Sequence, residues 1–177
     1  MGCEDRFPLD NGPPPAYPMF VGAQSPMRIA LAVVKDAETI LELQKLCYQS
    51  EAALNNDYTI PPLMQTLESM RAEFENKVIL KAREAGRIIG SIRGWMKDDT
   101  CHVEKVIVHP DFQNRGYGKK LLGAMEMVFQ RARRFELFTS DKSEKNLALY
   151  SKFGYREFKR QPLNEQVTLV YMEKIAY

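Results

Sequence analysis

Few residues in this chain could carry redox, metal or disulfide chemistry. Among its 177 residues, three are cysteine and two are histidine. The cysteines, Cys3, Cys47 and Cys101, are odd in number and far apart, with no Cys-x-x-Cys spacing, which favours reduced thiols in a cytoplasmic protein over a disulfide framework. Neither histidine has a carboxylate or thiol at ligand spacing, so we expect no metal site.

The sequence also lacks a long apolar run and a strong excess of charge. No stretch approaches the roughly 18–20 apolar residues that would cross a bilayer. Residues 1–20 contain acids and prolines where a signal peptide would have a basic and then an apolar segment. The formal net charge of +2 is too small to indicate a nucleic-acid or membrane partner. We therefore expect a protein that binds neither.

The composition changes near Met27. The preceding run NGPPPAYP cannot form a helix or a central strand, because proline lacks the amide donor and restricts the residue before it. We predict a proline-rich arm over residues 1–26, either a natural extension or a remnant of an upstream start. The remaining length suits one core, so residues 27–177 are predicted to form one domain.

From residue 28 onward, apolar periodicity predicts alternating strands and helices. Asp36 is the expected N-cap of the first helix, and Pro61 and Pro62 suit the first turn of a second one. Further helices are expected after the glycines near residue 116 and over residues 143–153. The expected strands are residues 28–34, 78–84, 87–96, 101–110, 134–140, 155–160 and 166–174. The order β-α-α-β-β-β-α-β-α-β-β predicts a mixed α/β sheet with helices on both faces.

Two glycines, Gly116 and Gly118, lie one residue apart in QNRGYGKKLL, immediately before a predicted helix. A Walker A loop would need a glycine at Gln113 and a hydroxyl at Lys120. A Rossmann fingerprint would need a third glycine at Leu121. Neither pattern fits. The remaining alternatives are a solvated basic turn, and a nest of backbone amides at a helix N-terminus that binds a diphosphate without a metal.

Two motifs resemble those of the GNAT family of N-acetyltransferases. Gln-x-x-Gly-x-Gly after the strand VIVHPDF is similar to the family's acetyl-CoA-binding motif, and SEKNLALYSKFGY is similar to its second motif. The resemblance extends over about residues 28–174, in element order as well as in the motifs, and is closest to small bacterial members. It implies a mostly antiparallel, twisted sheet in which two central parallel strands splay apart.

The resemblance also implies where acetyl-CoA would bind. The backbone of Val106, Ile107 and Val108 would pair with the pantetheine arm, with the Val108 amide as a candidate oxyanion donor. Asn146 would contact the same arm. The pyrophosphate would be held by Gln113, Asn114, Arg115, Gly116, Tyr117, Gly118 and Lys119. No metal is needed for this binding mode.

Tyr150 is the candidate general acid that the resemblance implies. Attack of an amine on a thioester releases a thiolate, and a phenol with a pKa of about 10 is protonated at neutral pH and can donate to sulfur. The alternative for Tyr150 is a packing role, because Leu147, Tyr150 and Phe153 fall at helical spacing.

Glu104 is the candidate general base, two residues before Val106. Because side chains alternate along a strand, we expect Glu104 and Val106 on one face and Lys105 on the other. The alternatives are a structural ion pair with a cation such as Arg93, and a water chain that takes the proton in place of Glu104.

The acceptor is expected to lie against the first two helices, their connection and the closing hairpin loop. Tyr48, Glu51, Asp57 and Tyr58 would give an acidic and aromatic lining that suits a cationic amine, although they could instead cap helices or pair with lysines. The implied activity is direct transfer of acetyl to a primary amine of a small molecule or peptide in a ternary complex. The alternative is a non-catalytic acyl-CoA sensor. Because many relatives form dimers, we also expect a homodimer.

Overall fold

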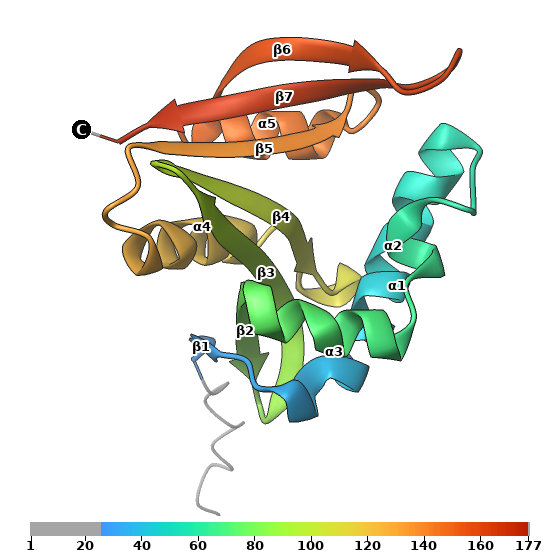
Figure 1. The fold of residues 1–177 in the computed structure, drawn as a ribbon. Helices are drawn as coiled ribbons and strands as arrows, with labels where there is room; N and C mark the ends of the chain where they lie inside the picture. The colour runs from blue at the N-terminus through green and yellow to red at the C-terminus, as the bar shows by residue number, and fades with distance from the viewer. Residues whose placement is uncertain (1–25, 177) are drawn as a thin grey trace, which may run out of the picture.

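A computed structural model describes residues 26–176, and a seven-stranded sheet runs through them (Figure 1). The predicted arm, apart from Pro26, lies outside the described residues. The strands are β1 (Arg28–Leu31), β2 (Val78–Glu84), β3 (Arg87–Lys97), β4 (Thr100–Val108), β5 (Arg134–Ser140), β6 (Arg156–Pro162) and β7 (Thr168–Ile175). Their order is β1-β2-β3-β4-β5-β7-β6, and only β4 and β5 pair in parallel. The predicted mixed, mostly antiparallel sheet is confirmed.

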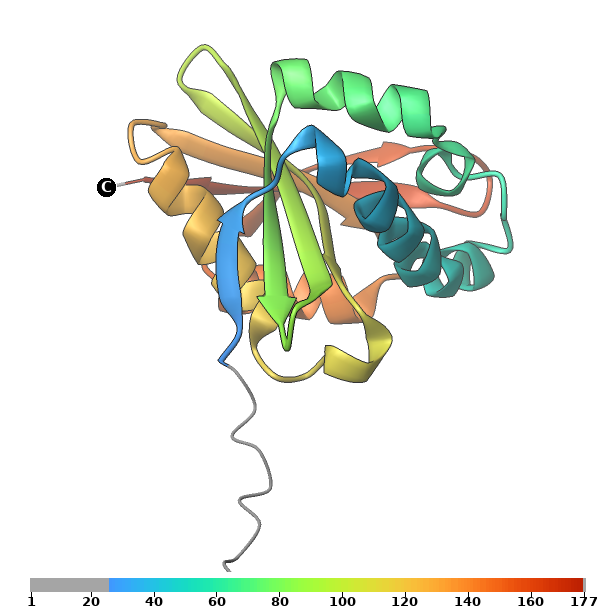
Figure 2. The same cartoon turned by 90° about the horizontal axis from the view of Figure 1, so that it is seen from below.

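Helices cover both faces of this sheet, as predicted (Figures 1 and 2). They are α1 (Ala37–Asn55), α2 (Pro61–Met64), α3 (Leu67–Asn76), α4 (Tyr117–Val128) and α5 (Glu144–Lys152), with short 3₁₀ turns η1 (Val34–Asp36) and η2 (Pro110–Phe112). On one face, α1 and α3 bury Ile40 and Met70 against Ile79 of β2. On the other, α4 contributes Leu122 to the larger core, which also contains Phe135 of β5.

The prediction of one helix after Pro61 is wrong, because the structure has two helices there. Prolines occupy the first turn of α2 as expected, but the chain is extended at Gln65 and Thr66. The Thr66 hydroxyl then accepts a hydrogen bond from the Ser69 amide at 3.1 Å and caps α3. A threonine N-cap satisfies an amide at the start of a new helix, and it therefore separates α3 from α2.

The parallel strands β4 and β5 are paired over only part of their length. The pairing runs from Thr100 opposite Arg134 to His102 opposite Glu136, whereas β4 continues to Val108 and β5 to Ser140. Beyond His102 the two strands are not paired and diverge, as Figure 1 shows. The splayed pair expected from the family resemblance is thus present, and it opens at the carboxyl ends of both strands.

Helix α1 contacts both sides of this opening. The Cys47 thiol donates to the Val108 carbonyl at the end of β4, with Sγ and O 3.4 Å apart. About two turns further along α1, Asn55 accepts a hydrogen bond at 3.0 Å from the Ser140 hydroxyl at the end of β5. The carboxyl-terminal half of α1 therefore lies across the ends of the two diverging strands.

A β-bulge in β4 overturns the expected alternation of its side chains. Lys105 has a left-handed backbone with φ of 49°, and the register with β3 shifts beside it. Glu104 and Lys105 both contact side chains of α3 and its C-cap, whereas Val106 packs against the core under α4. The prediction that Glu104 and Val106 share a face is wrong, because an extra residue in one strand reverses the alternation that follows it.

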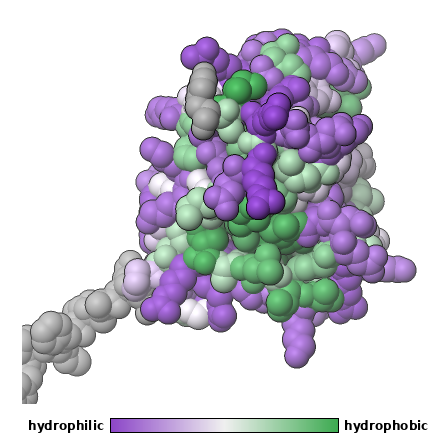
Figure 3. Space-filling model, turned by 60° about the vertical axis from the view of Figure 1, so that its left-hand side comes forward, coloured by the Kyte–Doolittle hydropathy of each residue, from purple (hydrophilic) through white to green (hydrophobic). Residues whose placement is uncertain are grey.

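The two edges of the sheet are protected in different ways. The edge strand β1 has only four residues, which limits pairing with another chain, and the other edge strand, β6, is exposed throughout and carries charged residues. On the side where α4 and β1 lie, apolar and charged residues are interspersed, with the apolar ones gathered in the lower half (Figure 3). Exposed apolar side chains of these two elements include Met127 and Leu31.

Candidate active site

The turn before α4 has the backbone geometry of an anion-binding nest. Asn114 and Gly116 are both left-handed, with φ of 61° and 76°, and Gly116 is the N-cap of α4. The first amides of a helix have no partner within the helix, and the helix dipole adds partial positive charge there. Alternating conformations of this kind turn successive N–H groups into one concavity. The turn can therefore hold a diphosphate through its backbone.

The two glycines of the turn are needed for different reasons. A Cβ on Gly116 would meet no atom within 4 Å, but its φ of 76° disfavours any other residue. Gly118 lies within the helix, where a Cβ would come 3.1 Å from Cδ2 of Leu149 on α5. Gly116 allows the bend, and Gly118 allows α5 to approach the start of α4.

Side chains of the turn mainly hold it in place. The Gln113 amide donates to the Val108 carbonyl at 3.1 Å, so it ties the turn to the end of β4. Arg115 donates to the Asp111 carbonyl at 3.0 Å, and the Tyr117 hydroxyl donates to Glu84 on β2. The nearby cationic residues are Arg115, just before the N-cap Gly116, and Lys119, in the first turn of α4. The groups of the turn that are left to hold an anion are therefore chiefly its backbone amides.

Helix α5 lies beside the end of β5, where the Asn146 amide is 3.5 Å from the Thr139 hydroxyl. Tyr150 on this helix is buried, and burial raises the pKa of its phenol, with the nearby Tyr48 phenol and Glu51 carboxylate acting in the same direction. Tyr150 is therefore a protonated phenol throughout the neutral range. This is the protonation state that a general acid requires.

Glu51, predicted for the acceptor site, contacts Asn146, predicted for the cofactor site. Its carboxylate, on α1, accepts hydrogen bonds from the Ser143 hydroxyl at 2.5 Å and from the Asn146 amide at 3.1 Å. Ser143 is the N-cap of α5, so the carboxylate also faces the positive end of that helix. Tyr48, one turn earlier on α1, is half-buried, and desolvation together with the Glu51 carboxylate raises the pKa of its phenol. The structure brings Tyr48, Glu51, Asn146 and Tyr150 together.

The other two predicted acceptor residues lie in the connection after α1. Asp57 accepts hydrogen bonds from the Thr59 hydroxyl and amide at 2.6 and 2.7 Å, which lower its pKa, and Tyr58 is 58% exposed. This connection and the loop between β6 and β7 face each other across a groove. Its lining residues are Asn55, Asn56, Asp57, Asn164, Glu165 and Gln166. The groove lies between the two segments predicted for the acceptor, and its use as an acceptor site stays a prediction.

Both carboxylate oxygens of Glu104 already have partners. One accepts from the Lys77 ammonium at 2.6 Å and the other from the Trp95 indole at 2.9 Å. Burial acts to raise the pKa of Glu104, but these hydrogen bonds and the charge of Lys77 outweigh it, so the pKa is lowered. Glu104 is therefore ionised but weakly basic, and its partner is Lys77 instead of Arg93. These contacts favour the water-chain alternative for the general base.

A Glu104→Gln variant tests whether Glu104 or a water chain is the general base. With a pKa below its ordinary value of about 4.3, Glu104 cannot produce an acidic limb near neutral pH. We expect kcat/KM of the variant to keep its acidic limb and to fall by far less than the ~100-fold that loss of a general base would cost. In a Lys77→Met companion, the Glu104 pKa rises toward its ordinary value. An acidic limb that moves upward in that variant would instead establish Glu104 as the base.

Cys47 was not predicted to belong to the site, yet its thiol contacts Val108. The helical spacing of Cys47 with Leu43 was the signal that it faces inward. Burial raises the pKa of its thiol to about 12, so it is not a thiolate at neutral pH. Since the thiolate is the nucleophilic form, Cys47 is unsuited to carry an acyl group. Among residues 26–176, no group of three or more His, Cys, Asp or Glu could hold a metal ion.

Comparison with known proteins identifies the family. The model of the Acetyltransferase (GNAT) family matches residues 37–155, a segment that contains both motifs and the opening between β4 and β5. The chain belongs to the GNAT acetyltransferase family. This acetyltransferase is 28% identical to a glucosamine 6-phosphate N-acetyltransferase from Trypanosoma brucei brucei over 147 residues, which cover 75% of this chain and 92% of the relative.

Solved structures share the fold of this acetyltransferase at low sequence identity. YncA from Salmonella typhimurium, determined with its cofactor acetyl-CoA, matches with a TM-score of 0.69 and 19% identity, over 86% of this chain and 95% of that one. PaiA N-acetyltransferase from Thermoplasma acidophilum, in complex with coenzyme A, matches with a TM-score of 0.71 and 16% identity, over 85% and 99%. Within the described part of the acetyltransferase, no helix is long and apolar enough to cross a membrane.

Proposed function

We propose that this acetyltransferase moves an acetyl group from acetyl-CoA to a primary amine by direct attack in a ternary complex. The observation that carries the proposal is the end of β4 that is not paired with β5 and leads into the amide nest, together with the buried Tyr150 on α5, a helix that contacts both α1 and α4. In this arrangement the nest binds the diphosphate of acetyl-CoA, and the backbone of residues 106–108 binds its pantetheine arm.

The proposed step is a substitution at the thioester carbonyl carbon. The amine nitrogen attacks, a C–N bond forms and the C–S bond breaks. The nitrogen loses a proton to water, or to Glu104 in the alternative above, and the departing thiolate takes the Tyr150 proton. The Val108 amide would donate to the carbonyl oxygen as negative charge develops there. The raised pKa of Cys47 favours this direct route over an acyl-cysteine intermediate.

We further propose that the acceptor is a cationic amine. The groove between the α1–α2 connection and the β6–β7 loop contains Asp57 and Glu165, and none of its described lining residues is Lys or Arg. The Trypanosoma relative is described as acting on glucosamine 6-phosphate, whose phosphate would be placed beside these carboxylates. Because like charges repel at short range, the groove favours an acceptor without a phosphate.

A thermal-shift measurement tests the first part of this proposal. Acetyl-CoA at about 100 times its Kd should stabilise the protein by about 2.7 kcal/mol, because the ligand binds the folded state only. A Gly116→Val variant is the matched control, since its Cβ meets no atom but its φ of 76° is unsuited to valine. We expect this variant to show a reduced shift. An unchanged melting temperature of the wild type with acetyl-CoA would contradict the proposal.

An acceptor screen tests the second part. Polyamines, aminoglycosides, amino acids, peptide N-termini and glucosamine 6-phosphate would be compared in a thiol-release assay. We expect polyamines and other cationic amines to be acetylated faster than glucosamine 6-phosphate, and an Asp57→Asn, Glu165→Gln double variant to reduce that preference. Faster turnover of the sugar phosphate would contradict the proposed acceptor, and tight CoA binding without any turnover would favour the sensor alternative.

A further inference from the structure

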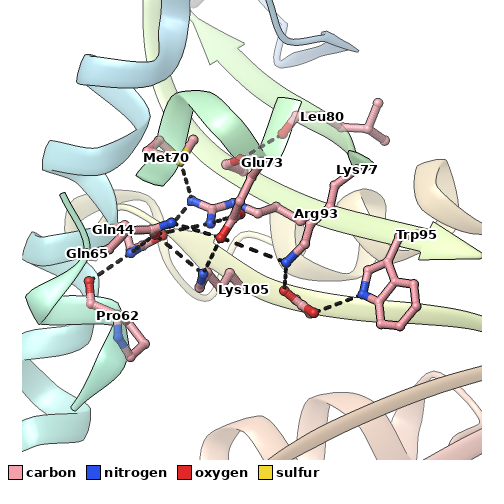
Figure 4. A network of polar contacts seen from close by, with 12 residues as sticks. Gln44, Pro62, Gln65, Met70, Glu73, Lys77, Leu80, Arg93, Trp95 and Lys105 are labelled. Carbon is pink, nitrogen blue, oxygen red and sulfur yellow. Dashed lines mark hydrogen bonds and ion pairs between the residues drawn. The ribbon is translucent and has the colours of Figure 1, made fainter. Parts of the chain in front are cut away.

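A network of charged and amide side chains lies between α1, α3 and the strands β3 and β4 (Figure 4). Its centre is Glu73 of α3, whose carboxylate faces three cations. Arg93 of β3 contacts it at 2.5 Å, Lys105 of β4 at 3.3 Å and Lys77 at 3.8 Å. Gln65 donates to the same carboxylate at 2.8 Å. The family motifs do not include any of these residues.

Two of these contacts converge on the bulge of β4. The Lys105 ammonium donates to Glu73 and to the Gln65 side-chain oxygen, at 3.3 and 3.4 Å. The pairing of β3 with β4 passes from Arg93 opposite Glu104 to Ser91 opposite Ile107. Lys105 and Val106 together therefore face the one residue Ile92, which is the arrangement of a β-bulge.

The bulge needs support from outside the strand. Lys105 adopts a left-handed backbone, which is unfavourable for a residue with a Cβ and persists only where surrounding contacts hold it. Its side chain is 18% exposed and is directed toward α3. Glu73, the carboxylate that Lys105 contacts, is itself held in place by Arg93 of β3. Arg93 is 1% exposed and also donates a hydrogen bond to the Gln44 side-chain oxygen of α1 at 2.6 Å. Lys105 is thus fixed to a rigid group.

The bulge determines which way the next backbone groups face. Val106 is the second residue of the bulge, and Ile107 and Val108 follow it, all in the part of β4 that is not paired with β5. An extra residue in a strand reverses the direction of the groups after it, so loss of the bulge would turn the amides of these residues away from the opening.

We propose that Lys105, held by Glu73 and Gln65, is a positioning residue that fixes the β4 bulge and thereby directs the backbone of residues 106–108 toward acetyl-CoA. This inference rests on the proposed function, since it concerns the same cofactor strand. It also links the acceptor side to the cofactor side, because α1, the α2–α3 connection and α3 all contribute to the network that holds Lys105.

A Lys105→Met variant tests the proposal by removing the ammonium and retaining the length of the side chain. We expect kcat/KM for acetyl-CoA to fall at least ~10-fold, since a displacement of about 1 Å at a reacting centre can cost ~100-fold. Amide hydrogen exchange of residues 106–108 should accelerate in the same variant. A Lys105→Arg variant keeps the contact with Glu73 and should recover most of the loss.

Lys81→Met is the matched control. Lys81 lies on β2, is 12% exposed and pairs with Asp36, but makes no described contact with β4. Both methionine variants lose a partly buried ion pair, and only Lys105→Met should change kinetics and exchange at residues 106–108. Equal kinetics in both variants would overturn the proposal. Failure of the wild type to bind acetyl-CoA would instead refute the proposed function, so the two failures are distinguishable.

Discussion

Replacing Tyr150 by phenylalanine is expected to lower kcat at least ~10-fold and to leave the Kd for acetyl-CoA unchanged. The variant loses only the hydroxyl, so the departing thiolate has no donor, whereas the packing of the ring against the core is retained. Steady-state kinetics at saturating acetyl-CoA would measure kcat, and isothermal titration calorimetry would measure the Kd. Unchanged turnover would assign Tyr150 a packing role.

Tyr155→Phe is a close control for this experiment. The Tyr155 ring lies 6.2 Å from the Tyr150 ring, and the residue is equally buried, with its hydroxyl near the Glu126 carboxylate of α4. Because this hydroxyl has no assigned part in the reaction, its removal should not reduce kcat. Because burial raises the pKa of Tyr150, no basic limb from this residue is expected below about pH 10 in the wild type.

Replacing Arg93 by methionine is expected to cause the largest loss of stability. The guanidinium is 1% exposed and contacts Glu73 and Gln44, so its removal leaves the partly buried Glu73 carboxylate short of a partner. Breaking a buried ion pair costs about 3–5 kcal/mol, and we expect about 3 because Lys77 and Lys105 still face Glu73. The melting temperature should fall by roughly 6–12 °C. Urea unfolding would measure the free energy directly.

Arg134→Met provides the comparison for Arg93. This arginine pairs with Glu136 and Glu173, but its side chain is 31% exposed, so the pairs are partly screened by water. Such pairs contribute at most about 1 kcal/mol, and we expect a correspondingly small loss. An equal loss in the two variants would show that the burial of Arg93 is unimportant.

Local patterns were sufficient to predict most of the fold. The strand at residues 134–140, the N-cap position of Asp36 and a helix that begins near residue 143 are as predicted, because apolar periodicity acts within a few residues. The same holds for the turn at Gly116, whose left-handed backbone follows from a glycine before a helix. The family motifs then identified which parallel strands diverge, which no single-residue property indicates.

What could not be predicted depends on contacts between distant segments. The bulge at Lys105 follows from a partner, Glu73, that lies 32 residues earlier in the chain, and the partners of Glu104 likewise come from α3's C-cap and β3. An alternation rule assumes an uninterrupted strand, so it assigned Lys105 to the wrong face. The contact between Glu51 and Asn146 spans 95 positions, and its two residues were assigned to separate subsites for the same reason.

The end of β4 that is not paired with β5 also affects how the sequence of this protein can change during evolution. Backbone N–H and C=O groups are present whatever the side chain, so a ligand that pairs with residues 106–108 as an additional strand reads no side-chain chemistry there. If acetyl-CoA pairs with this strand as proposed, Val106 and Val108 can be exchanged for other residues of suitable size without loss of acetyl-CoA binding. The groove proposed for the acceptor would have no such freedom, because its character depends on side chains such as Asp57 and Glu165. Substrate choice can therefore diverge while the acetyl source stays constant.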